Sequence, residues 1–530
     1  MEKSWYKFYP EGIPYEIDIS TTTSIFQILE QSESNYSSSI AVIDGENSLS
    51  YSELKKTSEY LASALYKRGF KKGDRLALML SNSLEYIVTF FAVHRLGGTI
   101  VQVNPMYQTH ELDKILKDSE ANWFIGYKED EIKLDNIGLT EELVKFFVDS
   151  DGEKSFIALI DEKGLNLPKL NINPQEDIAV LQYTGGTTGV PKGVILTHYN
   201  IVANINQISS FGKLIFKNGS NTFLGIAPMF HAMGMTNLVL NLSMGGTFIA
   251  LKRFESKTVI ELIRKHRPTL FTGSPTMYIA LLNYPDLRED DFHSLKLCVS
   301  GAAPMPLEII KKFRKVTNAL MIEGYGQSEV TTSSHRNPMP GMMKVGSIGI
   351  PITNTDAKIV DIDFGETEVP IGESGELIIK GPQVMKGYWK STEETEKTIR
   401  NGWLYTGDIA TRDEDGYFYI VGRKKEMIIA SGYNIYPMEV EEVLYEHPLV
   451  NEACVFGIPD TYRGETVKAI LVMNGTVSEE EIKNWCAERL AKYKVPRIIE
   501  FRDEIPKTSV GKVLRHKLVE EELSRLQIEK

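Results

Sequence analysis

The chain has 530 residues, of which 42% are hydrophobic and 25% charged, and its formal net charge is -12. This length exceeds the roughly 250 to 300 residues at which a single core stops growing, so we expect more than one domain. The ordinary composition excludes a disordered, fibrous or membrane-embedded class, and the acidic balance gives no reason to expect nucleic acid as a partner.

The cysteines and the apolar runs indicate the cellular setting. The three cysteines are far apart and never in a CxxC spacing, so neither a disulfide framework nor a zinc site is predicted: Cys298, Cys454 and Cys486. No apolar signal run opens the chain, and the longest apolar runs, such as Tyr86–Val93, are too short for a bilayer that needs about 20 residues. The C-terminal Gln527–Lys530 is no peroxisomal address. We therefore expect a cytoplasmic protein with no membrane span.

Strand-length apolar runs alternate with helix-period segments in the first 340 or so residues. Asp74–Leu80 predicts a buried strand, and Ser83–Leu96 predicts a helix that stops at Gly97. Further strands are predicted at Ile178–Tyr183, Thr222–Ala227, Thr269–Thr272 and Leu295–Val299. This alternation favours layered α/β architecture with mainly parallel strands.

The pattern of predicted helices and strands changes twice in the rest of the chain. Short strand-like pieces at Ala357–Asp361 and Glu376–Lys380 predict a β-rich subdomain. The last hundred or so residues predict a small α+β set: a helix over Pro437–His447, strands at Glu452–Phe456 and Val467–Met473, and a helix from Ser478. We therefore expect an α/β protein whose large N-terminal domain (1–422) combines layered α/β subdomains with the β-rich one. A small, mobile α+β domain (423–530) follows, with a hinge near Lys425.

A loop rich in glycine and threonine follows the strand predicted at Ile178–Tyr183. Glycines allow close backbone approach, hydroxyls donate and a lysine adds positive charge, which together suit a polyphosphate. The loop is not a Walker A loop, because glycine follows its lysine. Its candidate ligand-binding residues are Thr184, Gly185, Gly186, Thr187, Thr188, Gly189 and Lys192.

Four further segments carry residue types that suit a nucleotide and a metal. In Glu323-Gly324-Tyr325-Gly326-Gln327-Ser328-Glu329, a tyrosine between glycines offers a flat face to adenine and a carboxylate suits Mg²⁺. Asp408, after a glycine turn, can accept two ribose hydroxyls, and Arg423 has a planar fork for ribose or phosphate oxygens. Lys512, in Pro506-Lys507-Thr508-Ser509-Val510-Gly511-Lys512, is a cation on a short glycine loop.

These ordered motifs, from about residue 180 to 512, resemble the adenylate-forming superfamily of acyl-CoA synthetases, aryl-CoA ligases, beetle luciferases and the adenylation domains of peptide synthetases. The resemblance covers essentially the whole chain. It implies that Tyr325 stacks on adenine, Glu329 holds the metal and Asp408 binds the ribose. Ser328 stands where the superfamily usually has threonine, which keeps the hydroxyl.

The resemblance also assigns roles to residues that no pattern alone would single out. Lys425 matches the hinge position, and the turn with Gly432 and Tyr433 adjoins the coenzyme A tunnel. Gly301, Ala302 and Ala303 border the adenine and the acyl pocket. His231 lines the acyl site, and we place Met235 there as well.

The resemblance implies two half-reactions with ATP, Mg²⁺ and coenzyme A: a carboxylate becomes acyl-AMP, and the thiol of coenzyme A then displaces AMP. Lys512, Glu329 and Thr184 are the residues expected to act in catalysis, since charge neutralisation at the phosphate is the main task. None of the three cysteines has a neighbouring histidine that would suggest a covalent nucleophile.

The substrate and the neighbouring classes stay open. Apolar residues around Phe230, Met233 and Met235 favour a fatty acid, and aryl or hydroxy acids are the alternatives. A luciferase-like oxidoreductase would share the first step. A non-catalytic nucleotide sensor would be expected to lack Lys512 or Glu329. A peptide-synthetase adenylation domain would precede a carrier domain, for which the chain leaves no room. The state of assembly is open, with a homodimer as one alternative.

Overall fold

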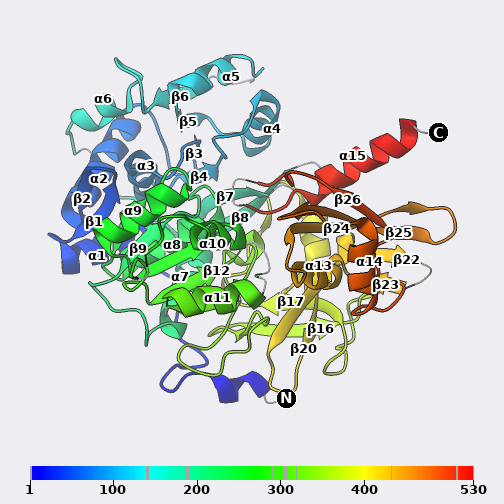
Figure 1. The fold of residues 1–530 in the computed structure, drawn as a ribbon. Helices are drawn as coiled ribbons and strands as arrows, with labels where there is room; N and C mark the ends of the chain where they lie inside the picture. Colours follow the sequence, from blue (N-terminus) through cyan, green and yellow to red (C-terminus); the bar gives the residue numbers. More distant parts are fainter. Residues whose placement is uncertain are drawn as a thin grey trace.

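The computed structural model describes residues 3–138, 143–165, 167–184, 191–288, 290–301, 305, 307–317, 319–430, 433–508 and 511–528. These residues form four sheets with helices packed against them. Figure 1 shows a large α/β body, a β-rich part beside it, and a small C-terminal part, coloured orange to red, next to the β-rich part. The predicted fold class, α/β with a small α+β C-terminal part, is confirmed.

The first sheet holds the strands that lead to most of the candidate site. Its order is β15-β14-β13-β12-β11-β9-β10-β1-β2, and β13, β12, β11, β9, β10 and β1 run parallel. The strands are β1 (Ile40–Asp44), β2 (Asn47–Ser50), β9 (Thr222–Gly225), β10 (Thr247–Ala250), β11 (Leu270–Gly273), β12 (Leu297–Ser300), β13 (Leu320–Tyr325), β14 (His335–Arg336) and β15 (Ile350–Pro351). Strands β9, β11 and β12 confirm three predicted strands.

The second sheet has the order β18-β8-β7-β4-β3-β5-β6, with parallel pairing from β7 to β6. Its strands are β3 (Arg75–Leu78), β4 (Thr99–Gln102), β5 (Trp123–Gly126), β6 (Val144–Phe147), β7 (Ile178–Thr184), β8 (Lys192–Thr197) and β18 (Gly387–Tyr388). The antiparallel pair of β7 and β8 carries the predicted phosphate loop at its turn.

Helices cover both faces of these sheets. One continuous apolar core joins the two sheets through α1 (Ile25–Tyr36), α2 (Tyr51–Lys67), α3 (Leu84–Arg95), α7 (His198–Phe211) and α8 (Ala232–Ser243). Helix α3 confirms the predicted helix and is buried almost all round, as expected of a helix that contacts both β4 and β1. The outer faces carry α9 (Ser256–His266), α10 (Pro275–Leu282) and α11 (Leu307–Thr317) on the first sheet, and α4 (Thr109–Ser119) and α5 (Glu131–Asp135) on the second.

The β-rich part and the C-terminal part each have their own sheet. The β-rich strands are β16 (Asp356–Val360), β17 (Gly375–Lys380), β19 (Ile399–Arg400), β20 (Trp403–Arg412) and β21 (Phe418–Arg423). The C-terminal part contains β22 (Ile428–Ala430), β23 (Tyr433–Ile435), α13 (Pro437–Tyr445), β24 (Val450–Asp460), β25 (Gly464–Met473), α14 (Glu479–Ala487), β26 (Ile498–Phe501) and α15 (Arg515–Ile528). The short helices are η1 (Ser4–Phe8), η2 (Lys128–Asp130), α6 (Phe156–Asp161), η3 (Ser328–Val330), α12 (Thr392–Thr398) and η4 (Lys424–Glu426).

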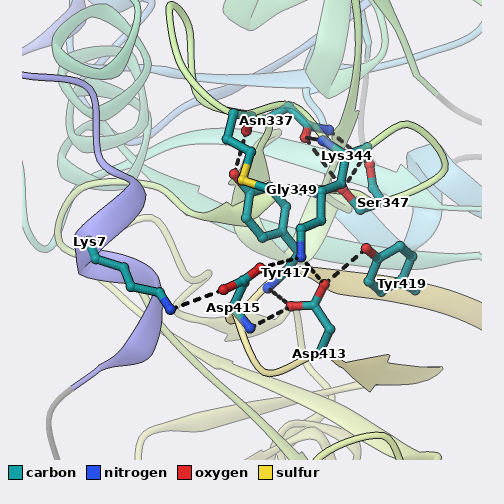
Figure 2. Close-up of polar contacts among 10 residues, drawn as sticks. Lys7, Asn337, Lys344, Ser347, Gly349, Asp413, Asp415, Tyr417 and Tyr419 are labelled. Atoms are coloured by element: carbon teal, nitrogen blue, oxygen red, sulfur yellow. Dashed lines mark hydrogen bonds and ion pairs between the residues drawn. The ribbon is translucent and has the colours of Figure 1, made fainter.

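A charged network ties together three segments that are distant in the sequence (Figure 2). Lys344 Nζ lies 2.6 Å from Asp413 and 2.8 Å from Asp415, in the turn between β20 and β21. Lys7, in η1, pairs with the second oxygen of Asp415 at 3.0 Å. Tyr419 donates its hydroxyl to Asp413 at 3.1 Å. The network fixes the loop that follows β14, which bears on the site below.

Two further predictions concern the cysteines and the membrane-spanning helices. Cys298, Cys454 and Cys486 are free and buried, and burial raises the pKa of each thiol. No helix in the described part of the chain is long and apolar enough to cross a bilayer.

Candidate active site

The predicted phosphate loop connects paired strands. Thr184 ends β7 and lies opposite Lys192, the first residue of β8. Gly185, Gly186, Thr187, Thr188 and Gly189 lie outside the described residues. Lys192 forms an ion pair with Glu394 of α12, and its Nζ lies 5.4 Å from the ring centroid of Tyr388. The lysine cation at the start of β8 is therefore paired with a carboxylate.

The segment Glu323–Glu329 leaves the end of β13 and crosses another part of the backbone. An added Cβ at Gly326 would lie 1.8 Å from the carbonyl oxygen of Thr332, so only glycine fits this crossing. Beyond it, Gln327 precedes η3, which holds Ser328 and Glu329. The predicted adenine residue, Tyr325, and the predicted metal residue, Glu329, therefore lie on either side of a close backbone crossing that only glycine at position 326 allows.

Asp408 lies at the centre of a hydrogen-bonded group. The pairing of β17 with β20 shifts register between Tyr405 and Ile409, a stretch that contains Asp408, which is buried. Its Oδ2 accepts from Tyr325 Oη at 2.5 Å and from Gln327 Nε2 at 2.6 Å. Its Oδ1 lies 2.8 Å from Arg423 Nε, on the neighbouring strand β21. Three of the roughly four lone-pair sites of the carboxylate are therefore occupied by protein donors.

This arrangement refines the sequence prediction for Asp408. The sequence predicted an acceptor free to bind two hydroxyls. In the structure, a hydroxyl ligand must take the remaining lone pair or displace Tyr325 or Gln327. Burial works to lower the pKa of Arg423, but Asp408 and other anionic groups raise it overall.

Lys512 reaches this group from the C-terminal part. Its loop is closed by hydrogen bonds from Lys512 N to Thr508 Oγ1 at 3.1 Å and from Thr508 N to Lys512 O at 2.8 Å. At Gly511, φ is +77° and an added Cβ would lie 2.3 Å from Thr276 Oγ1, at the start of α10. Glycine therefore lets the loop press against the large domain.

The Lys512 side chain lies at the surface, near the charged groups of the site. It is exposed to solvent, yet enough protein surrounds it that desolvation, together with Arg423, lowers its pKa. Asp408 and Glu426 act in the opposite direction. A cation held in this way gains stability when an anion arrives beside it.

Glu329 belongs to a second group of contacting residues, separate from the group around Asp408. Tyr388 donates its hydroxyl to Glu329 Oε1 at 2.9 Å, and β18 places Tyr388 beside β8 and Lys192. Sequence reasoning missed both Tyr388 and Glu394. Gly387 followed by two aromatics was a visible pattern, but nothing local in the sequence says that Tyr388 contacts a residue 59 positions earlier.

The predicted acyl residues lie on α8. His231 precedes the helix and Met235 is buried in its first turns. Burial lowers the pKa of His231 to about 4, so its imidazole is neutral at physiological pH, and its buried Nε2 has no hydrogen-bond partner among the described residues. Gly301 follows β12, whereas Ala302 and Ala303 lie outside the described residues.

The residues predicted for coenzyme A are not gathered with the others. Tyr433 is exposed and stacks on Tyr493 with ring centroids 4.5 Å apart. Lys425 lies in η4, directly after β21, and Gly432 is outside the described residues. In this conformation the structure therefore assembles Tyr325, Gln327, Asp408, Arg423 and Lys512, and leaves Tyr433 on the surface.

Glu323, two residues before Tyr325 on β13, has polar contacts of its own. Its Oε1 accepts from the backbone N–H of Met305 at 3.0 Å, and burial raises its pKa from 4.5 to about 7. A carboxyl that holds its proton more tightly when folded stabilises the protein below about pH 4.5. That contribution is lost as the pH rises through about 7.

Glu323→Gln, which mimics the protonated acid, is therefore expected to remain more stable than the unmodified chain at about pH 8 and to lose its advantage near about pH 5. Thermal melts across this range measure the difference. Glu373→Gln, at an exposed position, is the control and should leave the pH profile unchanged. Parallel profiles for the Glu323 variant and the unmodified chain would show that Glu323 titrates normally.

Two cations, Lys512 and Arg423, and the carboxylate of Asp408 meet beside the segment Glu323–Glu329, an arrangement that suits a phosphate-bearing ligand and a nucleotide-dependent class of enzyme. Residues 29–389 match the AMP-binding enzyme family, and residues 439–512 match the AMP-binding enzyme C-terminal domain. The chain belongs to the AMP-binding enzyme family and is an AMP-forming acid–thiol ligase.

Relatives and solved structures agree with this assignment. The long-chain-fatty-acid–CoA ligase of Bacillus subtilis (strain 168) is 41% identical, over 98% of each chain. ATP-bound MatB from Rhodopseudomonas palustris matches with a TM-score of 0.88 at 29% identity, over 94% of this chain and 98% of MatB. Apo MatB, at the same identity and coverage, gives 0.78. The anthranilate CoA ligase AuaEII with anthranoyl-AMP gives 0.89 at 28% identity, over 97% and 99%.

Proposed function

We propose that the chain joins an apolar carboxylic acid, a fatty acid or a related acid, to coenzyme A through an acyl-AMP intermediate. The observation that carries this is the meeting of Lys512, from the C-terminal part, with the pair of Asp408 and Arg423 on the adjacent strands β20 and β21. A carboxylate and a triphosphate repel each other, so a cation at their meeting point is the main catalytic requirement.

The proposed roles follow the two half-reactions. A carboxylate oxygen of the acid attacks the α-phosphorus of ATP, and the bond to pyrophosphate breaks. Lys512 neutralises the charge that develops, and Thr184 and Lys192 bind the departing phosphates. Asp408 and Arg423 bind the ribose and Tyr325 packs on adenine. The thiol of coenzyme A then loses its proton and displaces AMP from the acyl carbon.

The proposal includes Mg²⁺ bound by Glu329. The described residues contain no cluster of three or more metal-binding side chains, which fits an ion held by one carboxylate, phosphate oxygens and water. Glu329 has one oxygen bonded to Tyr388, which orients the carboxylate and leaves the other oxygen for the metal. Bound there, Mg²⁺ would offset phosphate charge.

Glu329→Gln is expected to raise the Mg²⁺ concentration needed for adenylate formation by about tenfold, because a neutral amide is a weaker ligand for a hard cation. Pyrophosphate exchange at varied Mg²⁺ measures this. Tyr388→Phe removes the orienting hydrogen bond but keeps the carboxylate, so a smaller shift is expected. An unchanged magnesium dependence in Glu329→Gln would remove this residue from the metal site.

We also propose that residues 423–530 form a domain that turns about Lys425 relative to residues 1–422. Two observations support this. Tyr433, assigned to coenzyme A, stacks on Tyr493 at the surface, while Lys512 lies near Asp408 and Arg423. The chain also matches ATP-bound MatB with a TM-score of 0.88 and apo MatB with 0.78, which supports an arrangement nearer to that of the ATP-bound form. A turn would bring Gly432 and Tyr433 to the acyl-AMP.

Buried, unpaired cysteines suit a reducing compartment, and we propose that the enzyme works in the cytoplasm. One chain supplies every residue of the proposed site, so the proposal requires no second copy, although a homodimer is compatible with it.

The test is a screen for AMP release that depends on both ATP and coenzyme A, across short, medium and long alkanoates, hydroxy acids and cinnamates. We expect thioester products from alkanoates or from acids of similar polarity. If amino acids alone exchange pyrophosphate, the proposed substrate class is wrong. Oxygen consumption or light with ATP would instead indicate luciferase-like chemistry.

A further inference from the structure

Arg336, on β14, is a buried cation without a counter-ion in the described part of the chain. Only 7% of the residue is exposed. Its Nε donates to Ser333 Oγ at 3.1 Å, and no carboxylate of the described residues pairs with it. Burial lowers its pKa to about 10, so it stays charged at neutral pH. Buried arginines are normally paired, because an unpaired buried charge costs several kcal/mol.

The strand pairing shows which way Arg336 points. Strands β13 and β14 are antiparallel, with Arg336 opposite Gly324, so both residues face the same side of the sheet. An added Cβ at Gly324 would lie 4.0 Å from both Cγ and Nε of Arg336 and 3.7 Å from Val299 Cγ1. Arg336 therefore extends across Gly324 on the Val299 face.

That face is the one covered by α8 and its predicted acyl residues. Gly301, two residues after Val299, would place an added Cβ 3.2 Å from Met233 Sδ on α8. The turn before β14 is bonded to the same helix: Thr332 Oγ1 donates to Ala232 O at 3.0 Å and lies 2.7 Å from Thr236 Oγ1. Arg336 thus lies on the sheet wall that faces α8.

The backbone beyond Arg336 is held firmly, as Figure 2 shows for Asn337. Asn337 Nδ2 donates to Ser347 O at 3.0 Å, and its Oδ1 accepts from Lys344 N at 3.0 Å. Lys344 is itself fixed by Asp413 and Asp415. This anchoring limits any movement of Arg336 toward solvent.

We propose that Arg336 determines acyl specificity, and that the preferred acid carries a second carboxylate, distant from the reacting one, which pairs with this guanidinium. The inference rests on the proposed acid–CoA ligase activity. An apolar body would pack on α8, and the second carboxylate would accept two parallel N–H groups from the fork. The ligand thereby supplies the counter-ion that the described residues lack.

The test compares dicarboxylic acids with monocarboxylic acids of equal length, in the unmodified enzyme and in Arg336→Met. We expect the unmodified enzyme to favour one diacid by about 100-fold in kcat/KM, as one buried charged pair allows. In Arg336→Met, kcat/KM for the diacid should fall by about that factor and kcat/KM for the monoacid should rise, while the KM for ATP stays unchanged. Arg336→Lys should keep part of the preference.

Thermal stability separates specificity from a structural role. Because no carboxylate of the described residues pairs with Arg336, Arg336→Met is expected to melt at the same temperature as the unmodified chain or higher. Arg314→Met, on α11 across the same sheet, is the matched control and should keep the diacid preference, although it loses a 2.7 Å bond to Met321 O. The inference is overturned if monoacids have the highest kcat/KM in the unmodified enzyme. It is also overturned if Arg336→Met has a lower melting temperature and its kcat/KM falls equally for all acids. If no acid at all releases AMP, the proposed function itself fails.

Discussion

Lys512→Ala is expected to slow acyl-AMP formation by roughly 10² to 10³-fold while leaving thioester formation from supplied acyl-AMP largely intact, since it removes one preorganised charge from the first transition state. The structure supports this because Lys512 stands with Asp408 and Arg423, whereas Tyr433 does not. Pyrophosphate exchange measures the first step, and thioester formation from synthetic acyl-AMP measures the second.

Lys507→Ala is the matched control for this variant. Lys507 lies in the same loop, but its Nζ pairs with Glu452 of the C-terminal part. Both steps should therefore survive its loss within a few fold, because a partly exposed ion pair contributes only about 1 kcal/mol. A defect as large as that of Lys512→Ala would mean that the loop as a whole, rather than the Lys512 charge, is required.

Lys425→Pro should fail in the opposite half-reaction. The proline ring fixes φ near about -65° and obstructs the backbone rotation that would present Gly432 and Tyr433 to the acyl-AMP. Adenylate formation should persist while transfer to coenzyme A falls. Equal loss of both steps in both Lys512→Ala and Lys425→Pro would indicate one fixed active site instead of two poses.

Asp408→Ala is expected to weaken the use of ATP by roughly 3 kcal/mol, about 100-fold in kcat/KM, through the loss of two charge-assisted hydrogen bonds. It also deprives Arg423 of the carboxylate 2.8 Å away. Because Asp408 is proposed to bind the ribose hydroxyls, the unmodified enzyme should prefer ATP to 2′-deoxy-ATP, and the variant should use both equally poorly.

Asp408→Asn is the companion variant, because it keeps the shape and one acceptor while removing the charge that balances Arg423. An intermediate loss of activity is expected, with a lower melting temperature in both variants. If the unmodified enzyme turns over 2′-deoxy-ATP as fast as ATP, Asp408 does not bind the ribose, and its contacts with Tyr325 and Gln327 are structural.

Local patterns in the sequence were enough to predict the fold class and several of its strands, but β13, β20 and β21, which carry Tyr325, Asp408 and Arg423, were not predicted. Buried parallel strands such as β3 contain a continuous apolar run, Leu76–Leu78, and α3 carries its own start and stop signals. Strands of two residues, such as β14 and β18, were not predicted, because so short a segment has no periodicity.

The sequence by itself also determined which residue types belong to the nucleotide motifs, since their glycines, carboxylates and cations occur at short, recognisable spacings. Only the tertiary structure decided which of these residues contact one another. Tyr325 and Asp408 are 83 residues apart, and Tyr388 and Glu329 are 59 apart, so their bonds depend on sheet order rather than on local pattern. The burial of Arg336 without a counter-ion among the described residues could not be predicted either, because burial is a property of the packed fold and a lone arginine has no pattern.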